Sequence, residues 1–135
     1  MTAIEVDEDV YGSWTVLRVR GELDLVTSPR IRRSVHDAVA GGRHDLVVDL
    51  SGVRFCDSSG VGVLIAARRL LRSCGGRLRL ILPGRAGKDG LGEEWAGDGH
   101  GHVDRVLSAL GVRRLFEVYE DVPEALTGVP GQSVL

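Results

Sequence analysis

Apolar residues along this chain switch repeatedly between two spacings, and this alternation limits the possible folds more than any other feature. Residues 14–20 alternate apolar and polar side chains, the period of a strand with one covered face, whereas residues 58–74 carry apolar side chains three and four apart, the period of a helix. Glycine pairs at 41–42 and 75–76 follow helical stretches, and glycine commonly ends a helix. The pattern predicts short strands alternating with short helices.

The expected elements follow one another in the order β-β-α-β-α-β-α-β-α. Strands are predicted at residues 2–6, 14–20, 46–50, 78–82 and near 115–119, with a turn at 11–13 inside a first hairpin. Helices are predicted at 29–40, from 58 or 59 to 74, across 103–110 and after Asp121. Thr27 is expected to cap the first of these helices. Because helices between strands act as crossovers, we expect an α/β fold with a mixed β-sheet of about four to five strands.

The 135 residues are expected to form one domain, residues 1–135, because this length suits a single hydrophobic core. The hydrophobic fraction of 43% and the charged fraction of 27% are those of an ordinary globular protein. Residues 84–101 hold seven glycines and interrupt the regular pattern. We expect this segment to be a flexible insertion outside the core, because ordering a glycine-rich backbone costs much conformational entropy.

No stretch of the sequence approaches the roughly 18 apolar residues of a membrane-spanning helix, and the first residues lack the basic and apolar regions of a secretory signal. A cytoplasmic location is therefore expected. The formal net charge of −2 gives no overall attraction to nucleic acid or to an anionic membrane, so neither is expected as a direct partner. Cys56 and Cys74 fall in apolar runs without metal-ligand spacing, and we predict that both are reduced thiols in the core.

Two glycine-containing stretches look like phosphate-binding loops but fail the corresponding motifs. Gly60-Val61-Gly62 lacks the third glycine of a dinucleotide fingerprint, where Ile65 stands. Gly87-Lys88 lacks the first glycine of a P-loop, and the next residue is an aspartate rather than the serine or threonine that binds Mg²⁺. Neither nucleotide motif is complete, and no cofactor is expected.

Catalytic and metal-binding arrangements are also incomplete. Ser58 or Ser59 would need a base for hydrolytic chemistry, and neither a histidine nearby in sequence nor a Gly-x-Ser-x-Gly elbow accompanies them. His100 and His102 are two possible metal ligands, whereas a closed site needs three or four, so we expect them in a solvated polar loop. No catalytic residue and no metal ligand are predicted, and a hydrolase is the weakest functional hypothesis.

The tetrapeptide Asp57-Ser58-Ser59-Gly60 stands at the predicted start of a helix, shortly after a buried strand. Aspartate and serine at such a position most often cap the helix. A helix N-terminus also tolerates an anion, because its first N–H groups lack partners within the helix. A serine at this position can therefore carry a phosphate without unfolding its own domain.

Four segments of the chain resemble, in order and spacing, the STAS-domain anti-sigma factor antagonists. They are residues 19–24, 45–53, 57–64 and 110–119, and the first of them includes Gly-Glu-Leu-Asp at 21–24. Asp57-Ser58-Ser59-Gly60 matches the family's Asp-Ser-Ser/Thr-Gly signature. The resemblance covers nearly the whole chain, apart from the insertion at 84–101 and the last residues, and it implies a single STAS-like domain.

The resemblance implies a switch between protein partners that phosphorylation controls. In the family, the unphosphorylated antagonist binds an anti-sigma factor that is also a serine kinase, and thereby releases a sigma factor to RNA polymerase. Phosphorylation of the first serine of the signature breaks this complex, and a metal-dependent serine phosphatase of the PP2C type restores it. Carried over to this chain, the resemblance makes Ser58 the phosphate acceptor and the protein a regulator rather than an enzyme.

The resemblance also assigns residues around the acceptor to the switch and to partner binding. These residues are Asp57, Ser59, Gly60, Val61, Gly62, Asp24 and Thr27. Gly60 and Gly62 are expected to keep the first helical turn slim for an approaching kinase. Two alternatives stay open, namely a STAS module that binds a nucleotide or another small molecule, and a subunit of a larger cytoplasmic complex.

Overall fold

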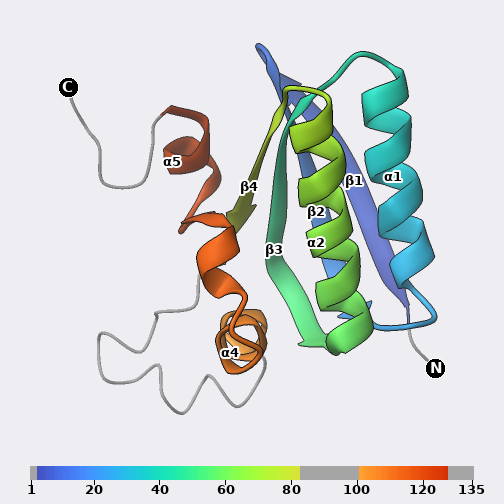
Figure 1. The fold of residues 1–135 in the computed structure, drawn as a ribbon, viewed down its shortest axis with the longest axis vertical. Helices are drawn as coiled ribbons and strands as arrows, with labels where there is room; N and C mark the ends of the chain where they lie inside the picture. The colour runs from blue at the N-terminus through green and yellow to red at the C-terminus, as the bar shows by residue number, and fades with distance from the viewer. Residues whose placement is uncertain (1–2, 83–100, 128–135) are drawn as a thin grey trace.

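A computed structural model describes residues 3–82 and 101–127 (Figure 1). Its elements are β1 (Ile4–Tyr11), β2 (Trp14–Leu23), α1 (Ser28–Ala40), β3 (Asp45–Cys56), α2 (Ser58–Ser73), β4 (Arg77–Ile81), α4 (His102–Ala109), the 3₁₀ helix η2 (Arg113–Leu115), β5 (Glu117–Tyr119) and α5 (Val122–Thr127). The predicted order of strands and helices is confirmed. The predicted insertion at 84–101 lies outside the described residues, except for Gly101, which immediately precedes α4 with a φ of 76°.

The five strands form one sheet in the order β1-β2-β3-β4-β5. β1 and β2 are an antiparallel hairpin, whereas β2, β3, β4 and β5 are parallel to their neighbours. The predicted α/β fold with a mixed sheet is therefore confirmed. Figure 1 shows α1 and α2 side by side across one face of the sheet, with α4 and α5 beyond β4.

Several strand boundaries differ from the prediction, including the end of β2, which continues past residue 20 to Leu23. β1 continues to Tyr11, so the hairpin turn consists of Gly12 and Ser13 alone, with a φ of 62° at Gly12. β3 continues to Cys56, because its second half pairs with the end of β2. β5 is limited to Glu117–Tyr119, because the residues shortly before it form η2.

The two cysteines occupy different environments. Cys56 is 2% exposed and belongs to the core, as predicted. Cys74 is exposed, so its predicted place in the core is wrong. The physical reason is that α2 ends at Ser73, and Cys74 follows at the C-cap, beyond the turns whose apolar side faces the sheet.

Apolar side chains cover both faces of the sheet. The larger cluster lies between the sheet and α1 and α2, and it includes Leu17, Val48, Leu80, Ile31 and Leu64. The smaller cluster lies on the other face, where Trp14, Val16, Val47, Ile81 and Tyr119 meet Ala125 of α5. Neighbouring residues of β3 thus enter opposite clusters, which explains why this strand has a nearly continuous apolar run rather than an alternating one.

The edge strand β1 carries a row of acidic side chains. Arg20 of β2 lies 3.0 Å from both Glu5 and Asp7 across the hairpin, and Arg18 pairs with Asp9. Exposed pairs of this kind add little stability individually. Charges along an edge strand do oppose pairing with a strand of another molecule, and β1 carries four of the chain's 19 acidic residues.

Arg79 of β4 is buried, although the alternation of arginine and leucine in this strand predicts an exposed side chain at its position. Its guanidinium carbon lies 4.4 Å from the ring centre of Trp14 and 5.2 Å from that of Tyr119. The same group donates to the Ala125 carbonyl at 2.7 Å and to the Glu117 carboxylate at 3.1 Å. Arg79 therefore connects α5 to the sheet.

We predict that Arg79→Ala lowers the free energy of unfolding by about 2–4 kcal/mol, because it removes a buried charged hydrogen bond and the contact with two aromatic rings. Equilibrium unfolding in urea, followed by circular dichroism, measures this loss. Arg77→Ala is the comparison: the Arg77 guanidinium carbon also lies over Trp14, at 4.8 Å from the ring centre, but its side chain is 53% exposed, so its loss should cost less than about 1 kcal/mol. Equal losses for the two variants would contradict the role given to Arg79.

Candidate functional site

The two predicted site segments meet where β2 and β3 end. Leu23 and Cys56 are paired at the ends of these strands, and the Asp57 N–H donates to the Leu23 carbonyl at 3.2 Å. α1 and α2 both begin here, at the lower end of the molecule in Figure 1. Parallel strands bring their carboxyl ends to one edge of a sheet, where ligands commonly bind. We name this region, residues 22–28 and 55–60, the signature end.

Asp57 caps α2. Its backbone is extended, with φ −110° and ψ −170°, and its Oδ1 atom accepts from the N–H groups of Ser59 at 2.9 Å and Gly60 at 3.1 Å. These are two of the N–H groups that a helix start leaves without partners. The predicted capping role of the signature is confirmed, and Asp57 is the residue that performs it. The carboxylate is thereby held at a fixed place in the first turn.

Ser58 and Ser59 differ in exposure. Ser58, the first residue of α2, is exposed, whereas Ser59 is half-buried. Within the part of the chain that the structure describes, the Ser58 hydroxyl has no hydrogen-bond partner. A hydroxyl in this position is open to a reagent from outside, and its modification breaks no contact of the fold.

The three residues after Ser59 have separate roles. A Cβ atom at Gly60 would lie 2.7 Å from Leu23 Cγ and 2.9 Å from Cys56 Sγ, so only glycine lets α2 approach the strand ends this closely. Val61 is 3% exposed and belongs to the core. Gly62 is exposed, and a Cβ atom there would meet nothing within 4 Å. Both glycines were expected to keep the surface of the first turn low for a kinase. Only Gly62 lies on that outer surface, whereas Gly60 is needed for packing against the core.

Asp24 and Thr27 close the turn between β2 and α1. Oδ1 of Asp24 accepts from the Val26 and Thr27 N–H groups at 3.0 Å each, and Thr27 Oγ1 accepts from the Asp24 N–H at 2.9 Å and donates to the Glu22 carbonyl at 2.7 Å. Thr27 stands at the predicted N-cap of α1, but its side chain does not cap the helix, because these bonds within the turn occupy it. Both side chains are nearly buried, so they shape the turn from within.

The same turn pushes two apolar side chains into solvent, which the sequence analysis did not single out. Leu25 and Val26 are 73% and 74% exposed, and Phe55 at the end of β3 is 44% exposed. We name these three residues the apolar rim. The available signal in the sequence was an apolar pair placed between two turn-forming polar residues, Asp24 and Thr27. Such a group of exposed apolar side chains is typical of a protein-binding surface.

α4 also begins near the signature end. The His102 ring stacks on Phe55 with 5.6 Å between ring centres, and its Nε2 atom lies 3.3 Å from the Cys56 carbonyl oxygen. His102 was expected in a solvated loop, but it is half-buried in the first turn of α4; His100 lies outside the described residues. Among the residues described, no group of three or more histidine, cysteine or acidic side chains is placed to hold a metal ion.

The electrostatics of the signature end favour a neutral thiol and a charged Glu22. Burial, followed by the negative charge of Asp57, raises the pKa of Cys56 to about 12, so this thiol does not become the reactive thiolate. The hydrogen bond from Arg54 at 2.5 Å, followed by one from the Ala3 N–H, lowers the pKa of Glu22.

Over the described ranges, no helix is both long and apolar enough to cross a membrane.

Comparison with known proteins identifies the family. Residues 2–91, which are most of the chain, match the family model of the STAS domain. The chain belongs to the STAS domain family. The match includes β1 to β4, α1 and α2, and therefore every residue assigned above to the signature end.

Several relatives of this chain are anti-sigma factor antagonists. The anti-sigma F factor antagonist of Paenibacillus polymyxa is 24% identical over 125 residues, 92% of this chain and 93% of that protein. The anti-sigma-F factor antagonist RsfB of Mycobacterium tuberculosis is 29% identical over 117 residues, 86% of this chain and 81% of that protein. The crystal structure of an anti-sigma factor antagonist from Mycobacterium paratuberculosis superposes with a TM-score of 0.71 at 25% identity, covering 95% of both chains.

These relatives confirm the family resemblance seen in the sequence. Antagonists act by binding, which agrees with the expectation of a regulator rather than an enzyme.

We predict opposite effects of alanine at the two glycines of α2. Gly60→Ala should lower the free energy of unfolding by about 1–3 kcal/mol, because its methyl group would overlap Leu23 and Cys56. Gly62→Ala should raise it by about 0.5–1 kcal/mol, because alanine favours a helix interior and has open space here. Urea unfolding curves of the two variants decide the question, and a shift of both in the same direction would refute the packing described for Gly60.

Proposed function

We propose that this chain is a cytoplasmic anti-sigma factor antagonist, and that phosphorylation of Ser58 switches off its binding to an anti-sigma factor. The observation that carries the proposal is the exposed Ser58 hydroxyl at the same end of the molecule as the exposed apolar rim, where the side chains of Asp24, Thr27 and Asp57 are engaged in hydrogen bonds within the fold. Family membership and the names of the relatives support the same role.

In the unphosphorylated state, the apolar rim gives the partner a surface to bury. Leu25 and Val26 stand out from a turn that internal hydrogen bonds hold rigid, so little conformational entropy is lost when a partner covers them. Burying apolar area contributes about 25 cal/mol per Å² before the costs of association. A neutral hydroxyl at Ser58 fits such an interface without a charge to desolvate.

In the phosphorylated state, Ser58 carries an added charge of about −1.5 to −2. The fold tolerates this charge, because an anion at a helix N-terminus gains roughly 0.3–1 kcal/mol. Repulsion from Asp57 acts in the free and bound states alike, and so it does not by itself release the partner. Stripping water from the phosphate within an interface built for a hydroxyl costs on the order of several kcal/mol. Changing the ratio of bound to free protein from 99:1 to 1:99 needs about 5.5 kcal/mol. A desolvation cost of several kcal/mol can supply a difference of this size.

The proposal requires two enzymes that act on this chain. A serine kinase, which we expect to be the anti-sigma factor itself, transfers the γ-phosphoryl group of ATP to Ser58 Oγ; the hydroxyl proton passes to the kinase base and ADP leaves. A metal-dependent PP2C-type serine phosphatase hydrolyses the resulting phosphoserine to serine and inorganic phosphate. The chain itself supplies only the acceptor hydroxyl and the surface that both enzymes recognise.

One observation favours the second candidate function, binding of a small anionic molecule. A hollow of about 350 Å³ lies at the far end of α2 from Ser58, and Arg68, Arg72 and Leu115 contribute to its lining. Arg68 is oriented by its Nε bond to the Leu115 carbonyl at 2.7 Å. Guanidinium groups suit carboxylates and phosphates. Titration of the protein with nucleotides, with Arg72→Ala as the comparison, distinguishes this candidate from the phosphorylation switch.

We predict that Ser58→Ala binds the anti-sigma factor constitutively, whereas Ser58→Asp and Ser58→Glu bind it more weakly but retain some affinity, because a carboxylate carries less charge than phosphate. Calorimetric titration against the candidate anti-sigma factors of the same genome measures the affinities, and circular dichroism should show an unchanged fold. Ser73→Asp, at the other end of the same helix, is the charge-matched control and should bind like the wild type.

The acceptor is identified by mapping the phosphate after incubation with ATP and the cognate kinase. We expect modification of Ser58 in the wild type and in Ser59→Ala, and none in Ser58→Ala. Phosphate on Ser59, or full partner binding by protein that is phosphorylated on Ser58, would defeat the proposed switch.

We also predict that Leu25→Asp weakens binding to the anti-sigma factor by at least about tenfold, because it places a charge in the apolar rim that the partner must desolvate. Leu110→Asp makes the same change at a 51% exposed leucine outside the rim, and it should have no effect on affinity. Both variants should unfold like the wild type in urea. Equal affinities for the two variants would exclude the rim from the interface.

A further inference from the structure

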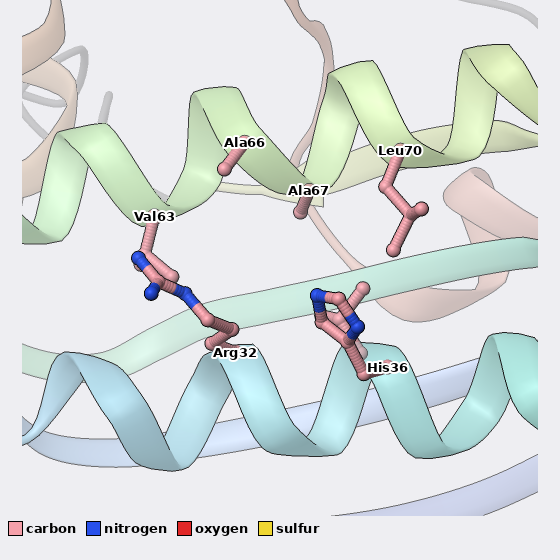
Figure 2. A pocket seen from close by; sticks show the side chains of 7 residues that line it. Arg32, His36, Val63, Ala66, Ala67 and Leu70 are labelled. Atoms are coloured by element: carbon pink, nitrogen blue, oxygen red, sulfur yellow. The ribbon is translucent and has the colours of Figure 1, made fainter.

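A small pocket, which we name the groove, lies between α1 and α2 on the outer side of the helical layer. Arg32 and His36 extend from α1 toward α2, and Val63, Ala66, Ala67 and Leu70 of α2 line the opposite side (Figure 2). The lining is mainly apolar and encloses a hollow of about 30 Å³, enough for one small side-chain group. None of these six residues belongs to the signature end.

Small residues of α2 lie at and beside the groove, since Ala66 lines it and Gly62 precedes Ala66 by about one helical turn. Gly62 and Ala66, four residues apart on one side of the helix, are both exposed. Gly62 has no positive φ, and a Cβ atom there would meet nothing within 4 Å, so the fold does not require glycine at this position. Glycine inside a helix costs about 1 kcal/mol relative to alanine. A glycine at this position leaves room for the backbone of another helix to approach.

The helices beside the groove are strongly basic. Together α1 and α2 contain six arginines and a single carboxylate, that of Asp37, although the whole chain has a net charge of −2. Within the described ranges 3–82 and 101–127, neither Arg32 nor Arg69 forms an ion pair. The acidic row on β1 is engaged by Arg18 and Arg20 of the neighbouring strand. The positive charge of the helical layer is thus left for a partner.

We propose that this groove docks an acidic amphipathic helix of a partner protein, which lies over Gly62 and Ala66, inserts one small apolar side chain into the hollow, and places carboxylates near Arg32, His36 and Arg69. A helix is the fitting shape, because side chains of one helix pack into the grooves of others and small residues let the axes approach. The inference is independent of whether Ser58 accepts a phosphate.

Two other kinds of partner fit this surface less well. An anionic membrane would need apolar side chains to insert, and every large exposed apolar residue of the described chain lies outside α1 and α2. A nucleic acid would use the arginines, but it leaves the apolar floor of the groove without a role. Both are included in the test as competing ligands.

The test uses the full ¹⁵N-labelled chain and a short synthetic amphipathic helix with alanine and leucine on one face and glutamate on the other. Titration should shift the amide signals of Arg32, His36, Gly62 and Ala66, and raising the salt concentration should weaken the effect. The same peptide with glutamine in place of glutamate should bind at least about tenfold more weakly. Vesicles of phosphatidylglycerol and a short DNA duplex should leave these signals unchanged.

Variants locate the binding surface. Arg32→Glu and Ala66→Trp should each reduce peptide affinity by at least about tenfold, the first by charge and the second by filling the groove. Arg114→Glu and Ala40→Trp make the same changes at exposed residues outside the groove and should not reduce it. Thermal unfolding followed by circular dichroism confirms that all four variants fold.

Three results would overturn the proposal. The first is the absence of peptide-induced shifts in the groove. The second is an equal loss of peptide affinity in the groove variants and the control variants. The third is binding of DNA or vesicles that is tighter than binding of the peptide and depends on the same arginines.

Discussion

The close contact of Gly60 with Leu23 and Cys56 is the constraint on which the signature end depends. It allows the first turn of α2 to rest directly on two paired strand ends, with the Asp57 N–H bonded to the Leu23 carbonyl. A side chain at this position would lift the helix, and with it the Asp57 cap and the Ser58 hydroxyl. The same contact buries Cys56 beneath α2, which explains both its low exposure and its raised pKa. The position of the Ser58 hydroxyl, the Asp57 cap and the burial of Cys56 therefore all depend on the absence of a side chain at position 60.

Periodicity predicted the order of the elements well, because it reports which side of each segment is covered. It failed where burial depends on partners far along the chain. The predicted strand ended at residue 50, yet β3 continues to Cys56 and its second half pairs with the end of β2. An arginine in a strand is normally expected to be exposed. Arg79 is buried because Trp14, Tyr119 and α5 pack around it from three other elements. No local pattern carries that information.

The site was predictable to the extent that its determinants are local. The capping pattern at a helix start indicated Asp57, whereas the choice of Ser58 over Ser59 came from the family resemblance, and the structure brings Asp24 to the same end because β2 and β3 are parallel. The hydrogen bonds that turn Asp24 and Thr27 inward, and Leu25 and Val26 outward, depend on the three-dimensional course of the turn. The sequence therefore indicated the signature but not the apolar surface at the same end.

The fixed position of the Asp57 carboxylate has a consequence for the energetics of the proposed phosphoryl transfer. Its two bonds to backbone N–H groups prevent it from turning away from a phosphate on Ser58. The repulsion between Asp57 and a phosphate on Ser58 is present both with and without the partner, so it does not affect partner binding. It is lost when the phosphoserine is hydrolysed, so it does affect the free energy of hydrolysis. The Asp57 repulsion opposes the gain of roughly 0.3–1 kcal/mol that a helix N-terminus gives to an anion. In the proposed switch, the carboxylate that caps the helix therefore favours return to the unmodified serine, whereas the helix N-terminus favours the phosphate.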